Sequence, residues 1–457
     1  MVAKRKVEMK IAFDGRLMHR KVTGLERYCR NLVCHLAELD TTNQYTIYSE
    51  EPIFEDDQLP SNYGFESAAD SIDFASKILS RKGEGTADIY HMTWTGESAI
   101  DVLLIKLIPT VLTVHDLILY KEKSYFPNEY LLQRKEKVIS VGIRFASRII
   151  ADSEYTRKTV CNNFDVDPEH VRTVHLACDE KFVRIDDAEK IKQTREKYGV
   201  EGKFIFNLGT DFPHKNVKNL ILAFNLLMDK GAFPATLIIA GNRTSLASTR
   251  ETEEALRQSP HAHNIKWIDH MPEEDLCAMY NAADVFAFPS LYEGFGLPIL
   301  EAMACGTPVV TANSTSIPEV AGDAALLIDG TSVSEIAESI QKVLTDTELA
   351  GRLVQAGFQQ AKKFSWDKTA GDTLQVYNEL YDEIKDRDIS RDLWQEWLQL
   401  HFLEIQNLER QIGELNESLR LREQHLQALL GTRTLNALRK IKRVADTIRG
   451  KAPEPED

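Results

Sequence analysis

The stretch of residues 283–310, ADVFAFPSLYEGFGLPILEAMACGTPVV, constrains the fold most because it contains a complete strand–loop–helix–strand pattern. Its apolar run Val285–Phe288 predicts a short strand buried in a parallel sheet. Pro298 stands where a helix can begin, since the first helical turn does not need its N–H. A glycine and a proline end that helix before the next strand. The pattern predicts an α/β fold with a Rossmann-like parallel sheet.

The loop between this strand and this helix predicts a site for an anion. Gly294 and Gly296 allow the backbone to approach a ligand closely. The start of a helix offers unpaired N–H groups and the positive end of its dipole, and both favour a phosphate. We therefore expect a phosphate group at this helix start.

Two carboxylates flank the expected phosphate site. Glu293 lies before the helix, and Glu301, with seven residues between them, is expected in its first turn. Carboxylates accept hydrogen bonds well, so this pair suits a ribose and a sugar ring. Either residue alone can be read as a loop charge or as a complement to the helix dipole. Together with the glycine loop, they favour a binding site.

This stretch resembles the E-x7-E region of retaining nucleotide-sugar glycosyltransferases of family 4, the glycosyl transferases group 1. The resemblance continues through residues 313–330, which include SIPEVAGDAALLIDG, and to FSW at 364–366, and it covers about the first four-fifths of the chain. It implies a GT-B fold, in which two Rossmann-like domains face each other across a cleft.

The resemblance also implies roles for individual residues. Lys215 and the glycine loop would hold a diphosphate, Glu301 a ribose and Glu293 the sugar hydroxyls, with His115 near the sugar. The implied donor-binding residues are Gly24, Lys215, Glu293, Gly294, Phe295, Gly296, Leu297 and Glu301, and the implied catalytic residues are His115, Glu293 and Lys215. No metal motif is present, so we expect neither a metal nor another cofactor.

The first half of the chain has its own strand pattern. MKIAFDGRL at residues 9–17 predicts a strand, which a loop with Gly24 joins to a helix from about Leu25. Arg27 and Tyr28 match a family pair, and their residue types equally permit a ligand contact or a structural role.

PTVLTVHD at 109–116 predicts a strand whose carboxyl end carries His115, where it would face the ligand crevice, although a loop histidine can also cap nearby backbone. Residues 50–85 look irregular apart from a helix near 72–79.

The second half begins near Arg195, and its first strand leads into a loop with Lys215. A lysine before a helix suits a pyrophosphate, although it can also be a solvated loop charge. The family usually places an arginine beside this lysine, whereas this chain has His214. Arg243, in another loop, is a candidate for the missing positive charge.

The carboxyl-terminal region has a different pattern. Residues 398, 405, 412, 419 and 426 are Leu or Ile at every seventh position, which predicts either a homo-oligomeric coiled coil over residues 391–430 or one amphipathic helix laid on the body. Residues 432–451 are basic with apolar positions at helical spacing. They suit an anionic membrane surface or a solvated helix end.

These patterns divide the chain into five expected segments. They are an acceptor-side domain at 1–194, a nucleotide-sugar-binding domain at 195–370, a crossover helix packed on the first domain at 371–388, the coiled coil at 389–430, and a basic amphipathic helix with a disordered tail at 431–457.

Composition limits the alternatives. The formal charge of −15 argues against general nucleic-acid binding. The six cysteines show no metal-ligand spacing, and the amino terminus has no apolar segment of a secretion signal. The most apolar region, residues 102–114, is too short and too interrupted to span a bilayer. We expect a cytoplasmic protein whose tail can contact the inner face of the cell membrane.

The expected function is retaining transfer of a hexose or deoxyhexose, with mannose favoured, from a nucleoside-diphosphate sugar to a glycan hydroxyl. The expected pathway is the assembly of surface polysaccharide, such as lipopolysaccharide, or of lipid-linked glycan. The alternatives are a nucleotide-sugar epimerase or a phosphorylase of GT-B fold, and a catalytically degenerate scaffold that oligomerises through the coiled coil.

Overall fold

The computed structural model describes residues 8–19, 24–51, 60–68, 71–80, 87–95, 99–121, 123, 129–231, 233–243, 249–269, 271–385, 410, 417–422 and 424. The chain divides into two compact units, residues 1–386 and 387–457. In the second unit the described residues 417–422 are helical, whereas most of the predicted coiled coil and the whole predicted basic helix lie outside the described residues. None of the helices described is long and apolar enough to cross a bilayer.

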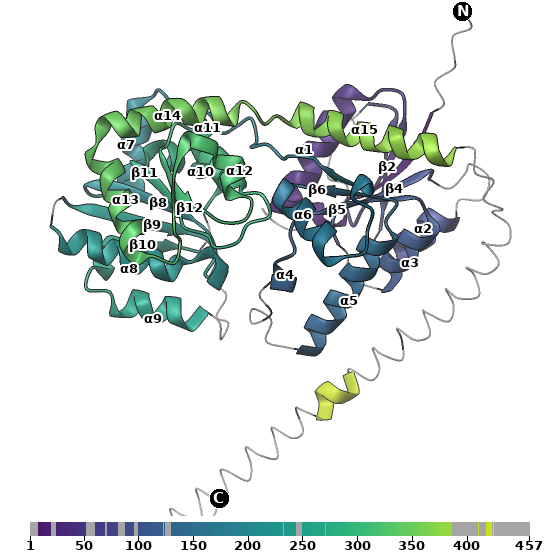
Figure 1. Ribbon diagram of the computed structural model, residues 1–457, viewed down its shortest axis with the longest axis horizontal. Coiled ribbons are helices and arrows are strands. Elements are labelled where there is room, and N and C mark those ends of the chain that lie inside the picture. The colour runs from purple at the N-terminus through teal and green to yellow at the C-terminus, as the bar shows by residue number, and fades with distance from the viewer. Residues whose placement is uncertain are drawn as a thin grey trace, which may run out of the picture. The chain divides into compact units, whose positions relative to one another are not determined.

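The first unit contains a seven-stranded parallel sheet with strand order β3-β2-β1-β4-β5-β6-β7. Figure 1 labels β2, β4, β5 and β6 of this sheet. Its strands are β1 (Lys10–Asp14), β2 (Gln44–Ser49), β3 (Tyr63–Ser67), β4 (Ile89–Met92), β5 (Thr110–Val114), β6 (Arg148–Ala151) and β7 (Val171–Thr173). The connecting segments include η1 (Arg16–His19), α1 (Gly24–Leu39), α2 (Ser71–Ser80), α3 (Ala99–Leu107), α4 (Ile118–Lys121), α5 (Glu129–Phe145), α6 (Glu154–Asn163) and η3 (Pro168–His170).

Strand β3 corrects the expectation that residues 50–85 are irregular apart from one helix. It pairs in parallel with β2 along its whole length. The side chains of YGFES are all exposed or half-buried, because β3 is the edge strand of the sheet. Such a strand lacks the apolar run or strict alternation that identifies buried strands in a sequence.

The same unit contains a second, six-stranded parallel sheet with strand order β10-β9-β8-β11-β12-β13. Its strands are β8 (Lys203–Leu208), β9 (Ala235–Ala240), β10 (Ile265–Ile268), β11 (Val285–Phe288), β12 (Val309–Ala312) and β13 (Ala325–Ile328). The helices are α7 (Ala188–Lys197), α8 (Val217–Asp229), α9 (Arg250–Gln258), α10 (Glu273–Ala282), α11 (Leu297–Ala304), α12 (Ile317–Ala321), α13 (Val333–Thr345), α14 (Thr347–Ala361) and α15 (Trp366–Ile384), with the short turns η4 (Pro213–Lys215), η6 (Ala262–Asn264) and η7 (Gly322–Ala324). The strand predicted at 285–288 is confirmed as β11.

Helices cover both faces of the second sheet, as they must when its strands are almost wholly apolar. Phe204 and Phe206 of β8 belong to one apolar cluster with α10 and α11, and Ile205 between them belongs to a second cluster with α8 and α13. The first cluster extends into the other sheet and includes Phe13 of β1 and Tyr28 of α1. One continuous apolar core therefore joins the two halves of this unit.

Both sheets reverse their strand order at a defined point, which is where open α/β sheets bind ligands. The reversal lies between β1 and β4 in the first sheet and between β8 and β11 in the second. The segments that follow the carboxyl ends of β1, β8 and β11 carry Gly24, Lys215 and Glu293 respectively.

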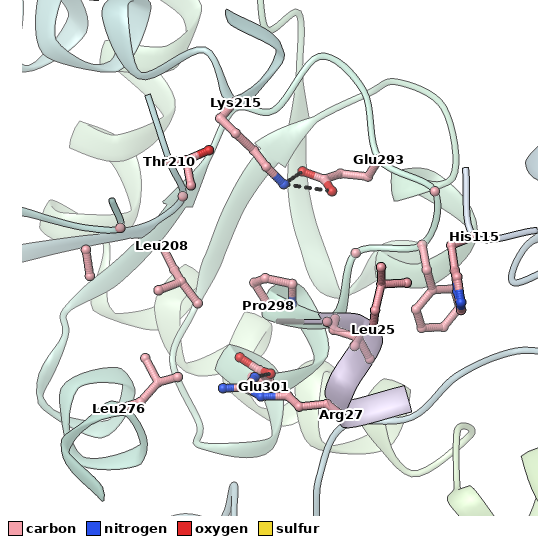
Figure 2. Close-up of a pocket in the computed structure, with 18 of the residues that line it drawn as sticks. Leu25, Arg27, His115, Leu208, Thr210, Lys215, Leu276, Glu293, Pro298 and Glu301 are labelled. Carbon is pink, nitrogen blue, oxygen red and sulfur yellow. Dashed lines mark hydrogen bonds and ion pairs between the residues drawn. The ribbon is translucent and has the colours of Figure 1, made fainter. Parts of the chain in front are cut away.

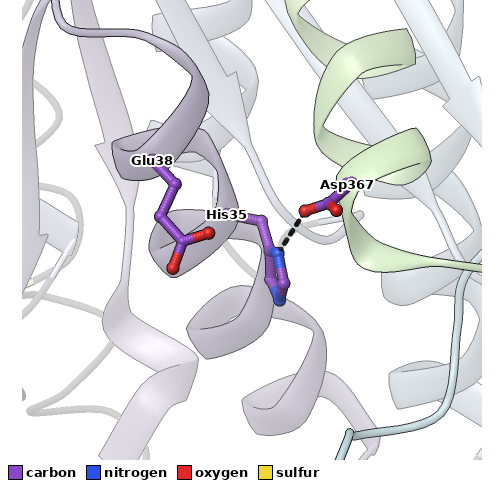
Figure 3. A group of neighbouring side chains, drawn as sticks. All are labelled: His35, Glu38 and Asp367. Atoms are coloured by element: carbon purple, nitrogen blue, oxygen red, sulfur yellow. Dashed lines mark hydrogen bonds and ion pairs between the residues drawn. The ribbon is translucent and has the colours of Figure 1, made fainter.

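Helix α15 packs against α1, although the two are far apart in the sequence. His35 of α1 and Asp367 of α15 form a hydrogen bond with an Nδ1–Oδ1 distance of 2.8 Å (Figure 3). The helix begins at Trp366 rather than at residue 371, because Ser365 caps its first turn by accepting a hydrogen bond from the N–H of Lys368.

A buried polar chain links α15 to the interior of the first sheet. The hydroxyl of Tyr377 bonds Nδ1 of His91, Nε2 of His91 bonds Thr113 Oγ1 at 2.8 Å, and that oxygen bonds the hydroxyl of Tyr28 at 2.9 Å. Burial lowers the pKa of His91 to about 3, so the imidazole is neutral at pH 7. A neutral imidazole has one donor and one acceptor, and both have a partner in this chain.

We expect Tyr377→Phe to destabilise the protein by about 1–3 kcal/mol, because it leaves a buried imidazole nitrogen without a partner. The measurement is the urea-unfolding midpoint, with Tyr381→Phe on the less buried side of the same helix as the control. Equal midpoints for the two variants would show that the polar chain adds nothing to stability.

Candidate active site

A cavity of about 640 Å³ lies among the strand ends of both sheets (Figure 2). This volume is within the range of sites that enclose a small-molecule ligand. The donor-binding and catalytic residues that the resemblance implies all line it, namely Gly24, His115, Lys215, Glu293, Gly294, Phe295, Gly296, Leu297 and Glu301. The structure therefore brings together residues from four separate segments of the chain.

The loop after β8 places Lys215 at the cavity wall. It ends in Asn216, which has a positive φ of 60° and directly precedes α8. The Asn216 amide donates to the carbonyls of Pro289 (2.9 Å) and Gly330 (2.6 Å). The N–H of Leu291 donates to the carbonyl of His214 at 2.7 Å. These bonds hold the lysine loop against the loop that follows β11.

Lys215 and Glu293 form an ion pair inside the cavity. The ammonium nitrogen lies 2.8 and 3.1 Å from the two carboxylate oxygens of Glu293 (Figure 2). The side chains are 22% and 12% exposed respectively. The sequence suggests a phosphate contact for the lysine and a sugar contact for the glutamate, and the structure places the two groups within bonding distance of each other. A phosphate that binds the ammonium would therefore compete with Glu293.

The amino terminus of α11 opens into the same cavity. Gly296 precedes the helix with a φ of 117°, and no side chain caps the first turn of this fully described segment. Pro298 lies in that first turn, as the sequence predicts. The helix starts at Leu297, so Glu301 lies in its second turn. The prediction that Glu301 lies in the first turn is therefore wrong.

Glu301 is buried at the opposite end of the cavity from Lys215 (Figure 2). Its two carboxylate oxygens accept hydrogen bonds from Arg27 Nη1 at 2.6 Å and from the Tyr280 hydroxyl at 2.8 Å. Burial raises the pKa of Glu301 even though Arg27 and Tyr280 oppose the shift. Each carboxylate oxygen can accept a further hydrogen bond, so the group can still bind a hydroxyl.

The structure separates the roles of Arg27 and Tyr28, which the sequence leaves open. Arg27 lines the cavity and connects α1 to α11 through Glu301. Tyr28 is fully buried, and its ring packs edge-on against His115 with the centroids 4.7 Å apart. Arg27 therefore forms part of the cavity wall, and Tyr28 supports the wall behind His115.

Both ring nitrogens of His115 are bound within the chain. Nδ1 lies 2.6 Å from Asp152 Oδ2, and Nε2 lies 2.8 Å from the carbonyl oxygen of Thr93. Burial would lower the pKa of His115, but the charge and hydrogen bond of Asp152 and the bond to Thr93 together raise it. The ring can therefore donate to both partners as an imidazolium. The contact with Asp152 is not evident from the sequence, although the ADS motif places an acid just after β6, beside β5.

The expected second cation is not found where the sequence suggested it. Arg243 forms a two-pronged ion pair with Asp269 at 2.7 and 2.8 Å and is not among the residues that line the cavity. Burial and the neighbouring Lys215 lower the pKa of His214 to about 4, so its ring is neutral at pH 7. Within the described part of the chain, the lysine and arginine side chains at this cavity are Lys215 and Arg27.

The described residues contain one group of side chains close enough together to hold a metal ion, His35, Glu38 and Asp367 (Figure 3). The group joins α1 to α15 and does not line the cavity.

Two family models match the chain. The model described as Glycosyltransferase Family 4 matches residues 22–182, and that described as Glycosyl transferases group 1 matches residues 188–360. The chain is 30% identical over 384 residues to the O-antigen chain mannosyltransferase B of Escherichia coli, a match that covers 81% of this chain and 99% of that protein.

Solved structures share the fold. Sucrose-phosphate synthase (tll1590) from Thermosynechococcus elongatus matches with a TM-score of 0.66 at 18% identity, over 82% of this chain and 100% of that one. Anabaena Alr3699/HepE in complex with UDP-glucose matches with a TM-score of 0.63 at 19% identity, over 81% of this chain and 100% of that one. The two parallel sheets and these likenesses confirm the GT-B fold. The chain belongs to glycosyltransferase family 4, the glycosyl transferases of group 1, and is a hexosyltransferase.

Proposed function

We propose that the protein transfers mannose from a nucleoside-diphosphate mannose to a glycan hydroxyl, with retention of anomeric configuration, during the assembly of surface polysaccharide. The observation that carries this proposal is the meeting of Lys215, the uncapped start of α11, Glu293 and Glu301 in one cavity. The choice of mannose is supported by the relative named as an O-antigen chain mannosyltransferase. The choice of a nucleotide donor is supported by the neighbour that holds UDP-glucose.

The chemistry requires that negative charge on the departing diphosphate be stabilised more strongly as the glycosidic bond breaks. Lys215 supplies a full positive charge, and the start of α11 supplies N–H donors and the positive end of a helix dipole. When the diphosphate binds the lysine ammonium, the Glu293 carboxylate is released from its ion pair. It then becomes available to the hydroxyls of the sugar.

Glu301 would bind the ribose hydroxyls at the other end of the donor. Its carboxylate is held in place by Arg27 and Tyr280, so it is oriented before the ligand arrives. Arg27 comes from α1 and Glu301 from α11, so this end of the site needs both halves of the unit. The arrangement is consistent with an enzyme whose halves close around the donor.

The test is to incubate the full chain with mannose donors and with glucose and galactose donors, each with a mannose-terminated acceptor. We expect the release of nucleoside diphosphate from the mannose donor to depend on the acceptor. We also expect the new linkage to keep the anomeric configuration of the donor, as read by NMR. An isomerised sugar formed without acceptor would identify an epimerase, and failure to bind any nucleotide would favour a scaffold.

Lys215→Ala should weaken the binding of nucleoside diphosphate by about 10- to 100-fold, because a charge-assisted hydrogen bond to phosphate contributes roughly 1.5–3 kcal/mol. Calorimetry on the full chain measures this. The control is Lys218→Ala, which removes a more exposed lysine of α8 that pairs with Glu251 at the surface. Equal affinities for the two variants would remove Lys215 from the phosphate site.

The carboxyl-terminal segments are proposed as a homo-oligomeric coil at 391–430 and a contact with anionic membrane at 432–451, from the heptads and basic residues of the sequence. Truncation after Asp386 should leave donor hydrolysis intact but reduce both the oligomeric mass and co-sedimentation with phosphatidylserine vesicles. If the full and the truncated chains co-sediment equally with vesicles, the membrane contact is contradicted. If the two chains have the same number of subunits per particle, the coiled coil is contradicted.

A further inference from the structure

Three consecutive carbonyl groups of the loop before α11 are each held by a buried hydroxyl group. They belong to Glu293, Gly294 and Phe295, and the hydroxyls belong to Ser153, Thr156 and Ser316. None of these hydroxyl residues is among those that line the cavity. They therefore bond the loop on the side that faces away from the cavity.

One hydroxyl comes from the second half of the unit. Ser316 lies just before α12, and its Oγ is 3.0 Å from the carbonyl oxygen of Glu293 and 2.8 Å from that of Phe295. A single hydroxyl proton is thus shared between two carbonyls. The neighbouring Thr315 accepts a hydrogen bond from the N–H of Glu293 at 3.0 Å.

The other two hydroxyls come from the first half. Ser153 caps α6, and its Oγ donates to the carbonyl of Gly294 at 2.7 Å. The Thr156 hydroxyl donates to the same carbonyl at 3.2 Å. A Cβ atom on Gly294 would lie 1.9 Å from the carbonyl oxygen of His115, so only glycine allows this approach. The two halves therefore meet at the backbone of this loop.

The carbonyl bonds determine where the N–H groups point. Across a trans peptide the C=O of one residue and the N–H of the next point in opposite directions, and no cis peptide occurs among the described residues. Holding the carbonyls of 293, 294 and 295 from behind therefore turns the N–H groups of Gly294, Phe295 and Gly296 away from the hydroxyls. All three of these residues line the cavity.

We propose that Ser153, Thr156 and Ser316 are positioning residues that aim the N–H groups of residues 294–296 at the phosphate that leaves the sugar. This inference rests on the proposed function, because it requires a diphosphate in the cavity. Donors that are oriented before the reaction stabilise developing charge without reorganising. Ser153 and Thr156 belong to the first half, so the amide site is complete only while the two halves are in contact.

Glu319 connects the segments that carry these hydroxyl groups, the start of α6 and the start of α12. It lies in α12, and its carboxylate accepts from the N–H of Glu154 at 2.9 and 3.0 Å and pairs with His175 at 2.5 Å. Its position at the amino terminus of α6 is favourable for a negative charge. Bonding to His175 and to the α6 backbone lowers the pKa of Glu319, although burial opposes this. The start of α6 and the start of α12 are thus held together as one polar cluster.

The test compares Ser153→Ala/Thr156→Val with the wild type, using the full chain and the nucleoside diphosphate that the wild type binds. We expect diphosphate affinity and kcat each to fall about tenfold, while affinity for the corresponding monophosphate changes less than twofold. Restoring the hydroxyls in the swapped variant Ser153→Thr/Thr156→Ser should recover most of the loss. Ser316→Ala should reproduce the selective loss from the other half.

The control is Ser314→Ala, which removes a nearby hydroxyl that bonds the carbonyl of Ser290 instead. If the wild type binds diphosphate and both hydroxyl-deficient variants keep its affinity and kcat, the inference is overturned. An equal loss of diphosphate and monophosphate affinity would also overturn it, because that is the result of a merely structural role. Failure of the wild type to bind any nucleoside diphosphate would instead contradict the proposed function. Should the double variant not fold, Ser316→Ala alone decides the question by the same two affinities.

Discussion

The balance of charge in the cavity is the constraint on which this site depends. Among the described residues, the acidic side chains Asp116, Asp152, Asp269, Glu273, Glu293 and Glu301 line it, together with the lysine and arginine side chains of Lys215 and Arg27. Each of those cations lies within bonding distance of a carboxylate, Lys215 of Glu293 and Arg27 of Glu301. A diphosphate therefore cannot enter simply by attraction to free positive charge. Its binding has to exchange one set of ion pairs for another.

Neutral donors become important under this constraint. The uncapped start of α11 and the amides of the preceding loop add hydrogen-bond donors without adding a charge that a carboxylate would pair with. The ring of His214, beside Lys215, is neutral at pH 7 and adds no second positive charge, which increases the importance of such donors. The buried hydroxyls behind the loop then gain importance, because they determine the direction of these amides.

The two halves of the unit are joined at several polar contacts around this loop. Arg27 reaches Glu301, Ser153 reaches the Gly294 carbonyl, and Glu319 reaches the start of α6. An apolar cluster that includes residues of both sheets lies beside these contacts. Site geometry and contact between the halves are therefore coupled, since the same bonds serve both.

The sequence by itself determined the local parts of this protein. The apolar run of β11, the glycines of the loop and Pro298 at the start of α11 are signals that depend on neighbouring residues alone, and they predicted a site at Gly294 and Gly296, which line the cavity. It missed β3, because an exposed edge strand has no apolar pattern to detect.

Only the tertiary structure decided the partners of these residues. Arg27 and Glu301 are 274 positions apart, and Ser153 and Gly294 are 141 apart. Their contacts arise because the carboxyl ends of parallel strands in two sheets face one cavity. A hydroxyl that orients a backbone amide, or a carboxylate that bonds His115, cannot be recognised from the periodicity or the composition of the sequence. The physical reason is that such bonds depend on distances in space, whereas local patterns record only which faces are buried.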